Sequence, residues 1–294
     1  MTDSKPWVPF AAALVSVVLW AAAFVGIRAA GTAFSPGALA LGRLTIGSLL
    51  LGALLLTRGG VRPTGRELGL LLLAGVTWFG LYNIALNTGE HSVDAGTASM
   101  LVMIAPLLIV MFAGVFLKER FTPGLVLGGL ISFAGVVVIG LATTKGESSL
   151  TGVVLCLAAA LVSAIGLVAQ KPVLRRLSAL QVTWTCCTIG ALVCLPYVAT
   201  LIREIGIAPR AGLGWLVFLG VFPTSVAFTT WAYALARGTA GRIAATAYLV
   251  PPVTIAISWA ILGEVPGGVA VLGGALCFVG VYIARRAPAP PKPA

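Results

Sequence analysis

The sequence contains the stretch AGTASMLVMIAPLLIVMFAGVFLKE at residues 95–119 and a related stretch, AGRIAATAYLVPPVTIAISWAILGE, at residues 240–264. The two agree without a gap in the opening Ala-Gly, in one proline, and in a leucine and a glutamate near the end. Pro106 corresponds to Pro251, and Glu119 to Glu264. Unrelated apolar helices share Leu, Val and Gly by chance, but they do not also keep a proline and a glutamate in one register. The match therefore indicates an internal repeat.

The offset of 145 residues extends the match beyond these two stretches. It places residues 75–76 on 220–221 and residues 126–136 on 271–281, where Val-Leu-Gly-Gly opens both segments. Earlier in each half, an offset of 143 places residues 45–47 on 188–190, both Thr-Ile-Gly. We predict three segments: a first half at residues 1–145, a second half at 146–286, and a disordered proline-rich tail at 287–294.

The composition indicates a membrane as the solvent. The chain is 59% hydrophobic and 9% charged, whereas soluble domains are about one quarter charged. About 20 apolar residues cross the ~30 Å hydrocarbon layer as a helix, and such stretches fill most of the chain. The sequence therefore predicts an all-α polytopic membrane protein with ten transmembrane helices. They are expected at about 10–29, 38–56, 68–88, 95–117, 124–142, 151–170, 180–200, 213–235, 240–262 and 267–284.

Each half has five spans, so the second half enters the membrane in the opposite orientation, and the repeat is expected to be inverted. Fourteen of the 19 Lys and Arg residues fall on the side of the two chain ends, which predicts cytoplasmic termini. We expect a location in the bacterial inner membrane. The first apolar stretch is longer than a typical signal-peptide core and is needed for the repeat, so we interpret it as a span.

Soluble and catalytic functions find little support in the sequence. The net charge is +11, and the basic residues lie in short loops between apolar stretches. This distribution fits control of membrane topology better than a nucleic-acid surface. The five cysteines lie in apolar stretches without metal-ligand spacing, and His91 is the single histidine. No nucleophile with a base and no paired carboxylates are visible. We therefore expect neither an enzyme nor a cofactor or metal.

The residues resemble those of the EamA-type members of the drug/metabolite transporter superfamily. The resemblance covers almost the whole chain and rests on the stretch 20–24 (Trp-Ala-Ala-Ala-Phe), on Arg43 and on the two repeat stretches. Within the family the chain most resembles the YddG-type amino-acid exporters. It implies an inverted-repeat transporter whose cavity is lined mainly by helices 1, 3, 4, 6, 8 and 9, with helices 5 and 10 more peripheral.

The charged residues within the spans limit which substrates and which kinds of proton coupling the sequence supports. No carboxylate lies deep in a span, which argues against a central proton-carrying acid, and Glu119 and Glu264 at span ends are expected to cap helices or pair with loops. Helices 3, 4, 8 and 9 carry no basic residue at mid-depth for a phosphate. Arg43 is the one basic residue well inside a span. It could snorkel, bind backbone carbonyls or meet a substrate carboxylate, and we favour a structural role.

Aromatic, amide and hydroxyl side chains at helical spacing form the expected binding site, although helix packing or lipid contact is an alternative for each one. The paired prolines are expected to bend their helices near mid-membrane and to serve cavity shape and gating. The expected cavity residues are Trp20, Trp78, Tyr82, Asn83, Met103, Ser163, Thr224, Phe228 and Tyr248, with Pro106 and Pro251 as the kinks.

We therefore expect a secondary transporter that exports small organic solutes by alternating access, with neutral and aromatic amino acids as the favoured substrates. An efflux permease of other specificity, a membrane-embedded enzyme and a channel are the alternatives. The expected partners are the substrate and the lipid bilayer, with no nucleic acid, and we expect a monomer.

Overall fold

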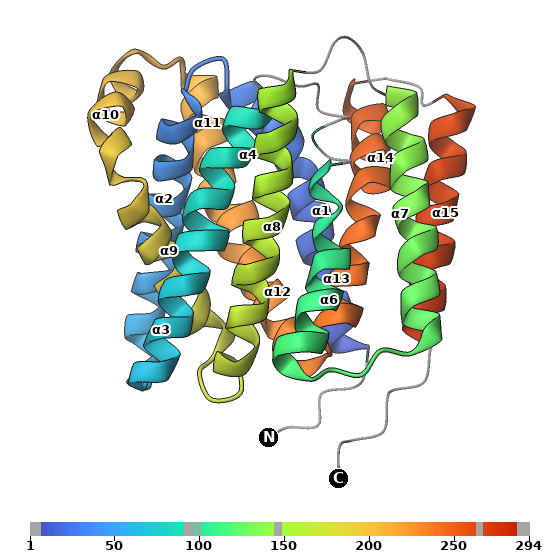
Figure 1. The fold of residues 1–294 in the computed structure, drawn as a ribbon. Helices are drawn as coiled ribbons and strands as arrows, with labels where there is room; N and C mark the ends of the chain where they lie inside the picture. The colour runs from blue at the N-terminus through green and yellow to red at the C-terminus, as the bar shows by residue number, and fades with distance from the viewer. Residues whose placement is uncertain (1–6, 91–97, 99–100, 144–148, 263–266, 287–294) are drawn as a thin grey trace.

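The computed structural model describes residues 7–90, 98, 101–143, 149–262 and 267–286, and these residues form a bundle of roughly parallel helices (Figure 1). The expected tail at 287–294 lies outside the described residues, as do His91 and Glu264. The helices of the first half are α1 (Val8–Ala30), α2 (Pro36–Arg58), α3 (Gly65–Ala74), the π-helical segment η1 (Gly75–Leu81), α4 (Tyr82–Glu90), α6 (Ala105–Leu117) and α7 (Pro123–Thr143).

The second half repeats this order. Its elements are α8 (Leu150–Val173), α9 (Ala179–Val193), the 3₁₀ turn η2 (Leu195–Tyr197), α10 (Val198–Ile207), α11 (Arg210–Leu219), the π-helical segment η3 (Gly220–Val226), α12 (Ala227–Arg237), α13 (Ala240–Thr246), the 3₁₀ turn η4 (Ala247–Leu249), α14 (Val250–Leu262) and α15 (Gly268–Arg286).

The helical, multi-span architecture confirms the predicted fold class, and the count of ten is approximate. Eight stretches of the described residues are long and apolar enough to cross a membrane. A ninth is formed if α9 and the segment Leu195–Ile207, which bend by 56° at Cys194, just before Pro196, make one span. The remaining expected span, at 95–117, is described mainly as the shorter apolar helix α6.

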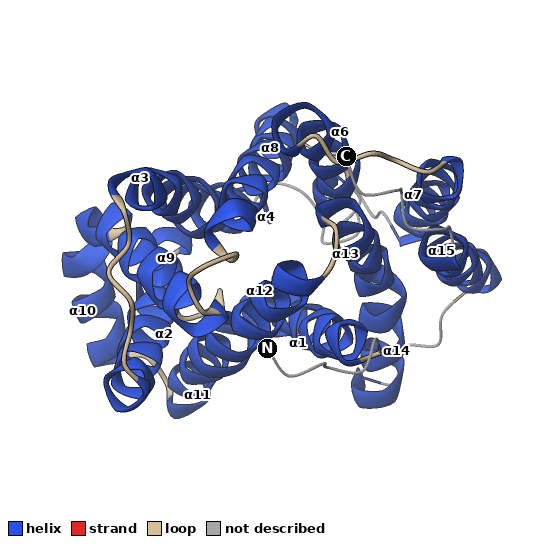
Figure 2. Cartoon of the chain, turned by 90° about the horizontal axis from the view of Figure 1, so that it is seen from below, coloured by secondary structure: helices blue, strands red, loops and turns tan. Residues whose placement is uncertain are grey.

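Helices α7 and α15 pack against each other at the edge of the bundle (Figures 1 and 2). Ser132 Oγ donates to the carbonyl of Cys277, and Cys277 Sγ donates to the carbonyl of Ser132, at 3.3 and 3.5 Å. Ser132 and Cys277 are 145 residues apart, so they are repeat equivalents of each other. The two bonds are therefore the same contact made once from each half. Such reciprocal contacts require a two-fold axis between the helices.

The direction of this axis follows from the glycines beside the reciprocal pair. Gly128 faces Gly280 and Ala284, whereas Gly135, further along α7, faces Gly273. The two helices are therefore antiparallel, and a two-fold axis that relates antiparallel helices is perpendicular to them. The repeat is inverted, as the odd number of spans predicts.

The same symmetry organises the other side of the bundle. Gly75 lies against Ile189 and Gly220 lies against Ile46, with an added Cβ falling 2.6 Å from the neighbouring Cβ in each case. The start of each π-helical segment therefore packs on a helix of the opposite half. The two halves interlock through these contacts, and the core is continuous between them.

The start of α1 and the end of α15 lie at one end of the bundle, where the Arg285 guanidinium lies 3.3 Å from the Phe10 ring centroid. We call this end the terminal face and the other end, where α2 begins, the opposite face. Pro106 and Pro251 are the second residues of α6 and α14, each directly after a break or 3₁₀ turn in its span. Both prolines thus stand at a discontinuity within the membrane segment.

Candidate functional site

A cavity opens between the two halves near the middle of the bundle. It offers about 100 Å³ to the centres of water-sized molecules, and about 10 to 15 Å³ is enough for one water. The cavity therefore has room for several waters or a small solute. Its walls are Trp20, Ala23, Phe24, Ile27, Arg43, Trp78, Tyr82, Leu86, Val102, Met103, Ala105, Pro106, Ile109, Ser163, Leu167, Phe228, Trp231, Ala244, Ala247 and Val250.

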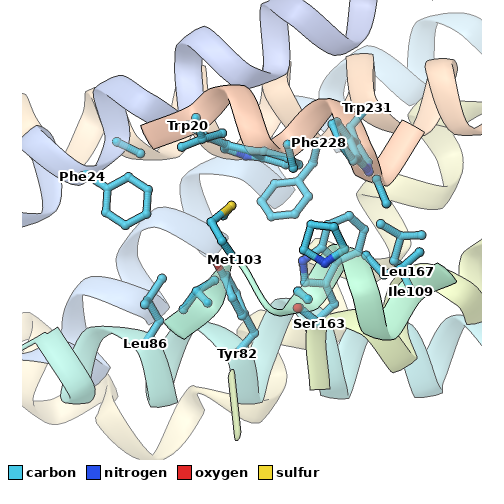
Figure 3. Close-up of a pocket in the computed structure, with 18 of the residues that line it drawn as sticks. Trp20, Phe24, Tyr82, Leu86, Met103, Ile109, Ser163, Leu167, Phe228 and Trp231 are labelled. Carbon is cyan, nitrogen blue, oxygen red and sulfur yellow. The ribbon is translucent and has the colours of Figure 1, made fainter. Parts of the chain in front are cut away.

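These residues come from the helices that the family resemblance implies, with Arg43 of α2 added. Trp20 and Phe24 of α1 lie with Phe228 and Trp231 of α12 on one wall (Figure 3). The opposite wall holds residues of α4, α6 and α8, and Met103 points between the two walls (Figure 3). Helices α7 and α15 contribute no lining residue among those described.

An aromatic cluster forms one side of the cavity. The Phe228 ring centroid lies 5.4 Å from that of Trp20, 5.1 Å from that of Trp78 and 4.4 Å from that of Phe79. The Trp20 and Trp231 centroids are 4.8 Å apart. Most of these rings meet edge to face or at a tilt, which are geometries that aromatic pairs prefer. The rings come from both halves, so movement of one half relative to the other changes the shape of this wall.

The π-helical segments explain how the third span presents its side chains. A π-helix places one extra residue in a turn, and such segments are frequent at functional sites. η1 presents Trp78, and Tyr82 follows directly at the start of α4. The equivalent segment η3 begins 145 residues later and is followed by the stretch that carries Phe228. Both halves thus use the same irregular backbone to direct aromatic rings.

Six of the nine expected cavity residues line this cavity: Trp20, Trp78, Tyr82, Met103, Ser163 and Phe228. Asn83 does not, since it is buried and its Nδ2 donates to the carbonyl of Phe79 at 2.7 Å. Tyr248 is buried in a smaller cavity beside Pro106 and α7. Thr224 is fully buried and packs on Gly47 of α2. Pro106 lines both cavities, and Pro251 is buried outside them.

Sequence reasoning missed Trp231 and Phe24 as lining residues, and simple spacing points to both. Trp231 is three residues after Phe228, and Phe24 is four after Trp20, so each pair shares a helix face. Trp231 Nε1 is buried without a hydrogen-bond partner in the described structure. Its N–H group is therefore available to an acceptor that enters the cavity.

Arg43 lies in the wall rather than at the membrane surface. It is 4% exposed, and its Nε donates to Thr224 Oγ1 of the other half at 3.0 Å. In the described structure Arg43 neither extends to the membrane surface nor binds a backbone carbonyl. Its bond to Thr224 is therefore the one contact there that fits the favoured structural role.

A polar link joins the two halves at the terminal face. Glu119, between α6 and α7, accepts the backbone N–H groups of Ala240 at 3.0 Å and Gly241 at 3.5 Å, at the start of α13. Within the second half, Lys171 Nζ of α8 donates to the carbonyls of Leu235 and Gly238 at the end of α12. The capping role expected for Glu119 is confirmed, and the cap connects the first half to the second.

Comparison with known proteins places these features in a family. The sequence profile of the EamA-like transporter family matches residues 7–141 and 150–286. The chain is 37% identical over 275 residues to the "Probable terminal-alkyne amino-acid exporter" of Streptantibioticus cattleyicolor, covering 94% of this chain and 92% of that protein. It is 28% identical over 193 residues to the "Aromatic amino acid exporter YddG" of Ancylobacter novellus, covering 64% of this chain and 66% of that protein.

Two further matches extend the comparison. The "Uncharacterized transporter YdfC" of Bacillus subtilis is 34% identical over 266 residues, with coverage of 90% of this chain and 86% of that protein. A protein of known crystal structure superposes with a TM-score of 0.76 at 23% identity, over 94% of this chain and 96% of that chain. This last likeness concerns the fold alone.

Proposed function

This chain belongs to the EamA-like transporter family, and from that premise we propose that it exports amino acids, aromatic and other neutral ones among them, by alternating access through the central cavity. Family membership makes it a multi-pass membrane transporter of small molecules rather than an enzyme. The substrate, the mechanism and the orientation are our proposal. We place it in the bacterial inner membrane with the terminal face toward the cytoplasm.

The position and shape of the cavity carry this proposal. The cavity lies between inverted halves, which is where transporters of this architecture bind substrate while one half rocks against the other. Its walls combine aromatic rings with a few polar groups, among them Ser163 and Arg43. Such walls suit a solute with an apolar side chain and a charged backbone end. The names of two relatives, both described as amino-acid exporters, support the same substrate class.

The discontinuities in the spans support the mechanism. Backbone irregularity at membrane depth is tolerated where it is buried in protein or lines a cavity, and here it occurs at equivalent places in both halves. η1 and η3 correspond to each other, as do the breaks before Pro106 and Pro251. At these places a span can bend while the helical segments on either side stay intact.

Substitution of Met103 by tryptophan is expected to reduce amino-acid flux about tenfold or more, because the larger side chain fills space that the substrate needs. Met103 points into the cavity and is 7% exposed. Met111→Trp is the matched control, since Met111 lies on α6, is 52% exposed and lines no described cavity. Uptake of labelled amino acids into proteoliposomes measures both variants. Equal flux through Met103→Trp and the wild type would place the pathway elsewhere.

A further inference from the structure

We propose that Arg43 is the anchor for a negatively charged group of the substrate, specifically its carboxylate. This inference rests on the proposed export of amino acids and assigns the recognition of one end of that substrate to one side chain. Arg43 lines the cavity although the residue is 4% exposed. Seven residues separate it from the start of α2, or about 10 Å along a helix at 1.5 Å per residue. The charge is therefore well inside the span.

The contacts of Arg43 hold its side chain and leave most of its donors available. Nε donates to Thr224 Oγ1 at 3.0 Å. Within the described residues, the two Nη groups have neither a hydrogen-bond nor an ion-pair partner, and the one ion pair found there joins Arg176 to Glu67. A guanidinium is a planar fork that matches a carboxylate with two parallel N–H donors. One edge of the fork is thus fixed, and the other is free for a ligand.

No carboxylate of the described residues forms an ion pair with Arg43. Glu90, the last residue of α4, forms no ion pair with Arg43 in the described structure. Its Oε1 is buried without a hydrogen-bond partner in the described structure. A buried charge without a close counter-ion is costly, so an anion that enters the cavity beside Arg43 removes an existing energetic penalty.

The inverted repeat supplies an internal comparison. Arg43 corresponds to Cys186 by the offset of 143, and Thr224 corresponds to Phe79 by the offset of 145. Both pairs occupy equivalent environments. Gly220 packs on the carbonyl of Arg43, and Gly75 packs in the same way on that of Cys186. Gly47 lies against Thr224, and Gly190 lies in the same way against Phe79. At the symmetry-equivalent positions, Cys186 and Phe79, the side chains are apolar. The fold itself therefore does not require an arginine here.

The asymmetry also orients the ligand. Arg43 lies closer to the opposite face, where α2 begins. Its apolar equivalent, Cys186, lies closer to the terminal face. A bound amino acid is therefore expected to direct its carboxylate toward the opposite face. The aromatic cluster of Trp20, Trp78 and Phe228 is left for its side chain and for cation–π contact with its ammonium group.

Binding to the purified protein tests the anchor, with L-phenylalanine, 3-phenylpropanoate and phenethylamine as probes, because only the first two carry a carboxylate. Arg43→Gln is expected to weaken binding of both carboxylates by about 10- to 100-fold, the range for a hydrogen bond to a charged group, and to leave phenethylamine unchanged. Arg43→Lys keeps the charge without the fork and should fall between. Arg203→Gln, an exposed arginine of α10, is the matched control.

The outcomes separate the anchor from the proposed function. Equal weakening of all three probes by Arg43→Lys, or unchanged carboxylate binding by Arg43→Gln, would overturn the anchor. If the wild type exchanges amino acids in liposomes while Arg43→Gln has the same KM for them, the anchor is wrong and the proposed function stands. If the wild type transports no amino acid yet binds 3-phenylpropanoate through Arg43, the proposed function is wrong and the anchor stands.

Discussion

Replacing Gly135 by alanine is expected to destabilise the protein by about 1–3 kcal/mol or more, as overpacking of a close contact does. A Cβ at this position would lie 2.6 Å from the carbonyl oxygen of Gly273 and 2.8 Å from the amide nitrogen of Cys277. Both are backbone atoms, so no side-chain rotation relieves the clash, and α7 and α15 must separate. The reciprocal bonds between Ser132 and Cys277 would be lost with this separation.

Gly129→Ala provides the control within the same helix. The nearest atom to a Cβ at Gly129 is Leu107 Cδ2 at 3.9 Å, an ordinary contact. Alanine is the better helix former by about 1 kcal/mol, so this variant is expected to be as stable as the wild type or more so. Thermal unfolding in detergent compares the two. If the Gly135 and Gly129 variants unfold at the same temperature, the antiparallel contact of α7 and α15 is wrong.

Replacing Glu119 by alanine is expected to open the terminal face. The carboxylate of Glu119 accepts two backbone N–H groups at the start of α13, where a negative charge is also favoured by the helix dipole. Loss of a hydrogen bond to a charged group costs about 1.5–3 kcal/mol. Because this bond joins the two halves, its loss should shift the population toward states open at that face by about 10- to 100-fold.

Labelling of a cysteine in the cavity measures this shift. Ser163→Cys places a thiol in the cavity wall, and the native cysteines are buried. An impermeant maleimide applied from the terminal face should react faster when Glu119→Ala is added. Glu204→Ala is the control, since Glu204 accepts the Ser35 N–H at 3.0 Å beside the start of α2, at the opposite face. Labelling that is equally slow with and without Glu119 would show that this bond does not close the cavity.

The sequence predicts the fold well because the repeat leaves a strong pattern. Ser132 and Cys277 differ in chemistry, yet the glycines around them keep one register, and that register correctly predicts the inverted halves. The ends of spans are also recognisable from their charges and prolines. Local irregularity is harder to predict, because nothing in the composition of residues 75–81 distinguishes a π-helix from an α-helix.

The placement of two expected cavity residues, Asn83 and Thr224, differs for the same reason. The carbonyl of Phe79 lies in the π-helical segment and accepts the Asn83 amide, which holds Asn83 away from the cavity. Thr224 and its equivalent Phe79 point toward the neighbouring helices, where Gly47 and Gly190 leave room for them. Helical spacing alone cannot distinguish a side chain that faces the cavity from one that fits beside a glycine of another helix.

The central claim is that the protein carries amino acids by alternating access, and counterflow in proteoliposomes tests it most directly. Liposomes loaded with unlabelled phenylalanine are diluted into a trace of labelled phenylalanine, and the label inside is followed over time. A carrier that exposes one cavity to each side in turn is expected to accumulate label transiently above its equilibrium level, and Met103→Trp should abolish this peak. Simple equilibration without a peak, or no entry of any neutral or aromatic amino acid, would contradict the account.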